Sequence, residues 1–243
     1  LSNAGRARKP RLVSAADQRD FFAEEPSVSS PAAAIGSRPV HQPLAARMRP
    51  RRLAEVVGQE HLLRPGSLLP RLVAQNRFGS LLFHGPPGSG KTSLAEAIAA
   101  ETGCRFVRVN AVMSNAAELR EVLAAARRRP GEATILFIDE LHRFNKSQQD
   151  SLLGAVERGL ITLIGATTEN PSFEVNSALL SRCQIYRLES LNLEETRSLL
   201  EHAIANDDAL KKRDIVVKEL DTLFKLSGGD ARKSVNLLEM YTD

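Results

Sequence analysis

From Ser80 onward, the chain alternates between short apolar runs and longer amphipathic stretches. The apolar runs predict strands, because each is rich in Leu, Ile, Val or Phe and is followed by polar residues or glycine; they cover residues 80–84, 105–109, 134–138, 161–166 and 184–188. Helical spacing of apolar residues lies between them, at 91–102, 116–129 and 147–158. This alternation predicts an α/β fold in which helices flank a five-stranded parallel sheet.

The pattern changes after Leu191, where helical spacing continues without another strand, at 193–205, 217–226 and 230–241. We expect an α/β domain at residues 41–190 followed by a small helical lid domain at 191–243. Residues 1–40 are rich in Ala, Ser, Pro and Arg with no sustained period, which predicts a disordered basic leader.

Charge is concentrated near the start of the chain. Residues 1–52 contain ten Lys or Arg and four Asp or Glu, a local charge of +6, so the net charge of +4 leaves about −2 for the rest. Such an arm can contact nucleic acid by counterion release, or it can be a solvated leader, and the sequence leaves both readings open.

Other features limit the class of protein. No apolar run approaches the ~18 residues of a membrane span, and the basic, polar start is not a signal peptide, so we expect a cytoplasmic protein without a membrane partner. Cys104 and Cys183 lack the spacing of a disulfide framework or a zinc site, so we expect both to be reduced.

A phosphate-binding motif follows the first predicted strand. Residues 85–92 read Gly-Pro-Pro-Gly-Ser-Gly-Lys-Thr and match G-x-x-x-x-G-K-[ST]. The glycines let backbone N–H groups point at phosphate, Lys91 can reach the β and γ phosphates, and the Thr92 hydroxyl can bind Mg²⁺. We therefore expect ATP with Mg²⁺, contacted by Gly85, Pro86, Pro87, Gly88, Ser89, Gly90, Lys91, Thr92 and Ser93.

Two acids close the apolar run 134–138. Asp139 can hold the Mg²⁺ shell, and Glu140 can orient and deprotonate the attacking water. Thr168, after the next predicted strand, can contact the γ phosphate or this water, or it can simply cap the following loop.

Two arginines are candidates for stabilising the transition state. Arg182 follows a short helix and can act as a finger supplied to a neighbouring subunit, or it can form an ordinary surface ion pair. Arg232, near the start of the last helix, can bring the lid onto the phosphates.

These motifs together resemble the AAA+ P-loop ATPases of the clamp-loader and RuvB branch. Four stretches narrow the resemblance to the RarA/MgsA family, the replication-associated recombination protein A family, which includes the eukaryotic Werner-helicase-interacting protein; they are residues 43–50, 57–63, 142–150 and 165–173. The resemblance covers residues 41–243.

The resemblance implies roles for individual residues. Thr168 would be the first sensor, Arg182 the finger acting in trans and Arg232 the second sensor. Val56, Val57 and Gly58 would lie near the adenine. Asn110 matches a polar switch residue that restrains the catalytic Glu until DNA binds. His84 stands where the family often has a tryptophan.

The resemblance also implies a DNA-dependent ATPase at stalled or damaged replication forks. Its expected partners are DNA with single-strand/double-strand junctions, the single-stranded-DNA-binding protein and further copies of the chain, as a tetramer. Family members continue beyond the lid, so we expect this chain to be a fragment. Without the cysteines for a ubiquitin-binding zinc finger, a bacterial, nucleoid-associated type is favoured.

A segment of the leader suggests a further partner. Residues 18–22 (Gln-Arg-Asp-Phe-Phe) resemble the pentapeptide that binds the bacterial sliding clamp, but Arg19 and Phe21 stand where leucines are usual. A transient local helix is the alternative.

Two other functions stay open. A clamp-loader subunit or a RuvB-like branch-migration motor shares the hydrolysis residues, although neither closely resembles residues 142–150. An ATP-gated adaptor with little turnover is the second alternative. Arg143 and Lys146 are candidates for DNA contact, subunit contact or a solvated face.

Overall fold

Five parallel strands form one sheet in the order β2-β3-β4-β1-β5. The computed structural model describes residues 42–213 and 215–242, so the predicted leader and the clamp-like segment at 18–22 lie outside the described residues. The strands are β1 (Ser80–His84), β2 (Arg105–Asn110), β3 (Thr134–Asp139), β4 (Thr162–Thr167) and β5 (Cys183–Arg187). The predicted α/β fold with a five-stranded parallel sheet is confirmed, and no observed strand end differs from the predicted one by more than one residue.

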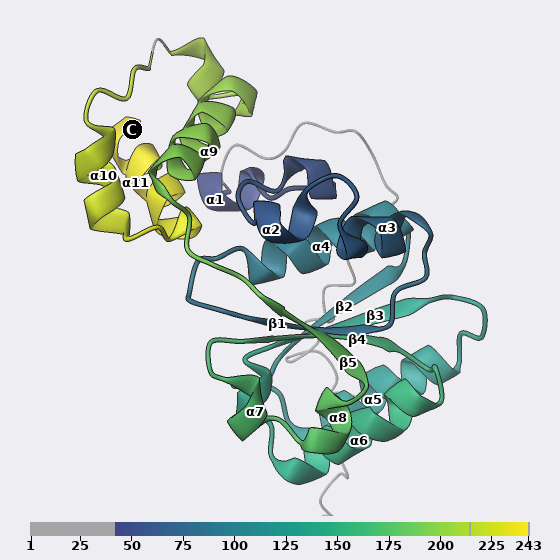
Figure 1. Cartoon of the computed structure of the whole chain (residues 1–243). Coiled ribbons are helices and arrows are strands. Elements are labelled where there is room, and N and C mark those ends of the chain that lie inside the picture. Colours follow the sequence, from purple (N-terminus) through teal and green to yellow (C-terminus); the bar gives the residue numbers. More distant parts are fainter. Residues whose placement is uncertain (1–41, 214, 243) are drawn as a thin grey trace, which may run out of the picture.

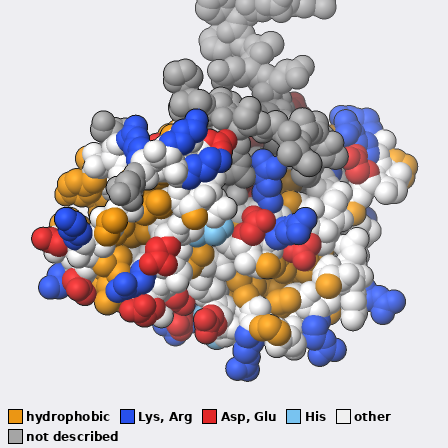
Figure 2. Space-filling model, turned by 90° about the horizontal axis from the view of Figure 1, so that it is seen from above, with side chains coloured by type: hydrophobic (Ala, Val, Ile, Leu, Met, Phe, Trp, Pro, Cys, Tyr) orange, Lys and Arg blue, Asp and Glu red, His pale blue; other side chains and the backbone are white. Residues whose placement is uncertain are grey.

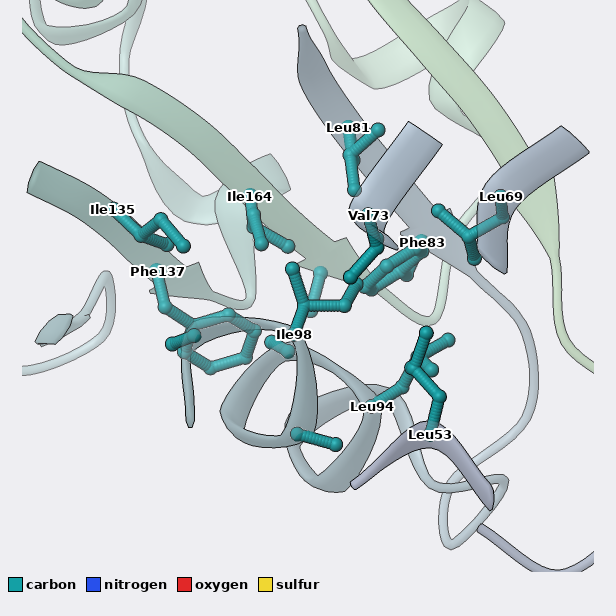
Figure 3. Close-up of a cluster of buried hydrophobic side chains, with 14 of the residues drawn as sticks. Leu53, Leu69, Val73, Leu81, Phe83, Leu94, Ile98, Ile135, Phe137 and Ile164 are labelled. Atoms are coloured by element: carbon teal, nitrogen blue, oxygen red, sulfur yellow. The ribbon is translucent and has the colours of Figure 1, made fainter. Parts of the chain in front are cut away.

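Both faces of the sheet are apolar because the central strands are buried on each side. Leu81 and Phe83 join a first cluster with residues of α3 (Leu68–Ala74) and α4 (Lys91–Thr102), and Figure 3 shows these side chains converging. Leu82 joins a second cluster on the other face, which α5 (Ala116–Arg127), α6 (Lys146–Glu157) and α8 (Ser177–Leu180) cover (Figure 1).

Asparagine side chains cap the N-termini of several helices. Asn145 accepts the backbone N–H of Gln148 at 2.9 Å, and the Gln148 side chain accepts the N–H of Asn145 at 3.0 Å, which forms a capping box at α6. Asn192 and Glu195 repeat this arrangement at α9 (Leu193–Asn206). These caps set where the helices start, so the sequence locates these ends to within one residue.

Several short elements did not appear in the sequence pattern, because a single turn is too short to show a helical period. They are α1 (Leu44–Arg47), η1 (Leu53–Glu55), α2 (Glu60–Leu63), η2 (Leu141–Arg143), α7 (Pro171–Glu174) and η3 (Leu210–Lys212). No helix in the described part of the chain is long and apolar enough to cross a membrane.

A third apolar cluster, here called the helical cluster, is built from α9, α10 (Leu220–Ser227) and α11 (Ala231–Thr242) and lies beside the sheet in Figure 1. Helix α1 also packs there: Leu44 is fully buried, and its N–H donates to Glu239 Oε1 at 2.8 Å. The expected helix start at Val217 is wrong, because α10 begins at Leu220, and residues 215–219 belong to no helix or strand.

An ion pair fixes α1 on the helical cluster. Arg47 Nε donates to Asp207 Oδ2 at 2.7 Å, and the Asp207 side chain is only 5% exposed. Burial would raise the pKa of this carboxyl, but hydrogen bonds from Arg47 and from the N–H groups of Ala209 and Leu210 outweigh burial and leave the pKa below its ordinary value. The carboxylate therefore stabilises the folded state when it is ionised.

We expect Asp207→Asn to lower the free energy of unfolding by about 2 kcal/mol at neutral pH, because a buried, charge-assisted pair is lost. Since the folded-state pKa is lowered, the difference from wild type is full above the unfolded-state pKa and disappears as pH falls through the folded-state pKa. Urea titrations at several pH values measure it. The neighbouring Asp208→Asn, at an exposed carboxyl paired with Lys211, is the control and should change little. A pH-independent loss in Asp207→Asn would contradict the ionic origin.

Candidate nucleotide-binding and hydrolysis site

The phosphate-binding loop connects the carboxyl end of β1 to the first turn of α4. At Gly85, a Cβ atom would lie 2.2 Å from the backbone oxygen of Leu188, and φ is +154°, so only glycine fits between the loop and the chain that leaves β5. The Gly85 N–H donates to the Thr167 oxygen at 3.2 Å. The loop is thus anchored to β4 and to the segment after β5.

Lys91 lies inside this loop. Its ammonium donates to the backbone oxygens of Gly85 and Pro86, both at 2.8 Å, and the residue is 8% exposed. Burial lowers the pKa of Lys91, while the carboxylates of Glu140, Asp139 and Asp230 oppose this shift. The predicted phosphate-binding lysine and both predicted acids are therefore brought together.

The phosphate-binding loop also contains a buried hydroxyl group that forms no hydrogen bond within the described chain. Ser89 Oγ is buried and has no hydrogen-bond partner in the described chain. A buried hydroxyl without a partner is costly unless a ligand satisfies it. Together with the buried ammonium of Lys91, this observation fits an anionic ligand such as a triphosphate.

The two predicted Mg²⁺ residues stand at the ends of neighbouring elements. Thr92 is the second residue of α4, and Asp139 is the last residue of β3. A hydroxyl and a carboxylate suit Mg²⁺, which takes only one or two protein ligands in phosphate sites. Asp139 Oδ2 lies 3.0 Å from Nη2 of Arg108, a residue that the sequence pattern did not single out.

Glu140 has a left-handed backbone, with φ +56° and ψ +44°. Such a conformation is unfavourable for a side-chain-bearing residue and persists where the surroundings enforce it. Its Oε2 atom lies 3.4 Å from His142 Nε2, and His142 Nδ1 lies 2.8 Å from Thr167 Oγ1. His142 therefore stands between the predicted general base and the end of β4.

Two other predicted residues lie at this edge of the sheet, and neither is hydrogen-bonded to Glu140 in the described part of the chain. Thr168 is exposed and follows directly after β4, while Thr167 is the buried hydroxyl. The Asn110 side chain accepts the N–H of Val112 at 2.9 Å, and no hydrogen bond joins it to Glu140 within residues 42–213 and 215–242. The sensor role of Thr168 and the switch role of Asn110 stay predictions.

Arg182 lies apart from its own phosphate loop. It precedes Cys183, which pairs with Ser80 at the start of β1, whereas the loop follows the end of β1. The Arg182 side chain is exposed and contacts Glu157 Oε1 at 2.6 Å and the Ala178 oxygen at 2.8 Å. Within one chain, Arg182 therefore does not join the site.

The helical cluster touches the loop directly. The N–H of Ala231 donates to the Gly88 oxygen at 3.2 Å, and a Cβ at Gly88 would lie 2.0 Å from the Asp230 carboxyl carbon. Arg232, the predicted second sensor, is exposed in the first turn of α11 beside this contact.

Gln59 joins three segments around the loop, although no sequence signal distinguished it. This buried side chain donates to the oxygens of Ser89 at 3.3 Å and Glu189 at 2.7 Å, and it accepts the N–H of Glu189 at 3.0 Å. The partly buried residues 56–58, predicted to lie near the adenine, immediately precede it.

Comparison with known proteins agrees with this geometry. The family model of ATPases associated with various cellular activities (AAA) matches residues 81–191. Replication-associated recombination protein A of Escherichia coli strain K12 is 49% identical over 207 residues, which make up 83% of this chain and 46% of that protein. The chain belongs to the RarA family of AAA+ ATPases. The resemblance expected from the sequence is thereby confirmed.

Other relatives of this RarA-family chain agree. ATPase WRNIP1 of Dictyostelium discoideum is 42% identical over 202 residues, 82% of this chain and 23% of that protein. The solved structure of the Thermotoga maritima RuvB Holliday junction branch migration motor has a TM-score of 0.64 at 30% identity, covering 79% of this chain and 64% of that chain. The chain spans about half the length of the bacterial RarA relatives it matches.

We expect Gly88→Ala to destabilise the protein more than Gly103→Ala. Both glycines have left-handed backbones, with φ of +71° and +64°, so both substitutions introduce similar strain of about 1–2 kcal/mol. Only at Gly88 does the new methyl group meet another side chain, that of Asp230, because a Cβ at Gly103 meets no atom within 4 Å. Thermal or denaturant unfolding measures the difference.

The same contact can be tested by a double-mutant cycle. Asp230→Ala alone removes the hydrogen bond that its carboxylate accepts from Lys233 N–H at 2.9 Å, but in the Gly88→Ala background it also removes the clash. The two changes together should therefore cost less than their sum. Strict additivity would show that the helical cluster does not lie against the loop in solution.

Proposed function

We propose that this chain is the ATPase portion of a DNA-dependent ATPase of RarA type that acts at stalled or damaged replication forks. The observation that carries the proposal is the meeting of Lys91, Asp139 and Glu140 at one edge of the sheet, where the two carboxylates act electrostatically on the buried ammonium. RarA-family membership supports the fork as the place of action.

The proposed reaction is in-line attack of water on the γ phosphorus of ATP. Glu140 takes a proton from the water as the new P–O bond forms, and the bond to the β–γ bridging oxygen breaks, so that ADP and phosphate leave. Lys91 exchanges its contacts with the loop oxygens for phosphate oxygens and offsets their charge. When bound, Mg²⁺ would be held by Thr92 and Asp139 and would neutralise further phosphate charge.

The rest of the nucleotide would be held by neighbouring segments. The loop residues Gly85 to Ser93 surround the phosphates, Val56, Val57 and Gly58 receive the adenine, and Thr168 orients the γ phosphate. Arg232 would approach the phosphates from α11, since Ala231 already bonds to the loop oxygen of Gly88. Each of these roles is part of the proposal.

Arg182 would complete the site of a neighbouring subunit. Its exposure of 40% and its position at the opposite end of β1 from the loop support action in trans over action in cis. A head-to-tail arrangement of identical chains would bring this arginine to the next phosphate loop. A homo-oligomer, a tetramer in the longer family members, is therefore part of the proposal.

DNA is the proposed polymer, with single-strand/double-strand junctions as its preferred form. On the face seen in Figure 2, acidic and basic side chains of the described residues are interspersed, so this face offers no continuous basic surface to a DNA backbone. Arg143 and Lys146, exposed beside Glu140 in sequence, are the proposed contacts. Single-stranded-DNA-binding protein and the sliding clamp are further proposed partners, in the bacterial cytoplasm at the nucleoid.

A RuvB-like branch-migration motor is the second candidate, favoured by the fold similarity at a TM-score of 0.64. The higher identity to replication-associated recombination protein A, 49% against 30%, supports the RarA reading. An ATP-gated adaptor would not need a general base poised beside the phosphate loop.

We expect Glu140→Gln to reduce kcat for ATP by about 100-fold or more while ATP binding is retained, because the general base is lost but the loop is intact. Phosphate release, measured with and without forked DNA, and binding of a fluorescent ATP analogue give the two readouts. Glu194→Gln, at an exposed glutamate of α9, is the control and should behave as wild type. If wild type hydrolyses ATP no faster than Glu140→Gln at saturating protein and fork, the adaptor reading is correct.

Mixing two inactive variants tests the shared site. Arg182→Ala subunits keep an intact loop, and Lys91→Ala subunits keep an intact arginine, so about a quarter of the head-to-tail interfaces in an equal mixture should regain both groups. ATPase activity of the mixture should exceed that of either variant alone. Arg197→Ala, on the exposed surface of α9, replaces Arg182→Ala as the control and should be active by itself. No recovery in a mixture shown to contain mixed oligomers would count against action in trans.

A further inference from the structure

His142 lies between the proposed general base Glu140 and Thr167 at the end of β4. Its side chain is only 8% exposed. One ring nitrogen, Nδ1, lies 2.8 Å from Thr167 Oγ1, and the other, Nε2, lies 3.4 Å from Glu140 Oε2. Both ring nitrogens therefore face groups at the carboxyl ends of the central strands.

The groups on both sides of the ring favour one tautomer of this histidine. Thr167 Oγ1 accepts the N–H of Glu169 at 3.0 Å, and its own proton can be donated to His142 Nδ1, 2.8 Å away, when that nitrogen carries no proton. The ring proton is then on Nε2, so it points at the carboxylate of Glu140. The opposite tautomer would turn a nitrogen lone pair toward that carboxylate, which is repulsive.

The same threonine is joined to the phosphate loop. Thr167 is fully buried, and its backbone oxygen accepts the N–H of Gly85 at 3.2 Å. A continuous path of contacts therefore runs from the phosphate loop through Thr167 and His142 to Glu140. Its three links measure 3.2, 2.8 and 3.4 Å, and every residue along it is at least partly buried.

We propose that His142 is a positioning residue, which donates its Nε2–H to Glu140 and orients that carboxylate toward the attacking water. This inference rests on the proposed ATP hydrolysis. The distance of 3.4 Å is longer than a formed hydrogen bond, and catalytic hydrogen bonds commonly shorten only when the substrate is bound. The left-handed backbone of Glu140 is a strained conformation of the kind that clusters at functional sites.

Two substitutions separate the two ring nitrogens. His142→Gln can retain a donor at the position of Nε2, whereas His142→Asn can retain only the hydrogen bond to Thr167. We expect His142→Asn to lower kcat by about tenfold or more, with KM and the dissociation constant of an ATP analogue nearly unchanged, and His142→Gln to keep most of the activity. Phosphate release and equilibrium binding measure these quantities.

A matched pair at Thr167 tests the other end of the path. Thr167→Val removes the hydroxyl that holds His142 Nδ1 and should lower kcat, while Thr167→Ser keeps the hydroxyl and should restore it. Unfolding temperatures of all four variants accompany the kinetics. The proposal is overturned if His142→Asn has wild-type kcat, or if the Asn and Gln variants lose kcat equally and in step with their stability. Absence of ATP hydrolysis in wild type would instead refute the proposed function.

Discussion

Strand β4 lies between β1 and β3, and its backbone hydrogen bonds hold the carboxyl ends of all three strands at one edge of the sheet. Parallel pairing makes this possible, because every strand then ends on the same side. His84 pairs with Thr167 in this register, so the phosphate loop begins beside the end of β4. The neighbouring end of β3 supplies Asp139 and Glu140, which brings charged groups from distant parts of the chain within reach of one ligand.

Much of this arrangement could be predicted from local signals. The strands are continuous apolar runs because both faces of the sheet are covered, and the glycine-rich loop has a residue pattern that few other structures require. Asp139 and Glu140 stand directly at the end of such a run, so their position at the sheet edge follows from the parallel fold. Helices α6 and α9 start at asparagine caps that can be recognised from the sequence.

Other features depend on contacts between distant residues and have no local signal. A glutamine such as Gln59 becomes informative only when its partners Ser89 and Glu189, 30 and 130 residues away, are known. Likewise, nothing in the residues around Arg108 indicates that it pairs with Asp139 from the adjacent strand. Helix α1 is a single turn, and its packing on the helical cluster rests on the apolar side chains of Leu44, Ala45 and Met48 and on the ion pair of Arg47.

The position of α1 means that the chain passes twice between the sheet and the helical cluster. It leaves the helical cluster after Met48 and enters the first core at Leu53, and it returns from Leu188 to α9. A group of helices joined to the rest of the protein by one chain segment can rotate in any direction. A group joined by two segments rotates most easily about the line between the two attachment points. A movement of the helical cluster caused by nucleotide would therefore follow a single axis, and its direction would be the same in every cycle.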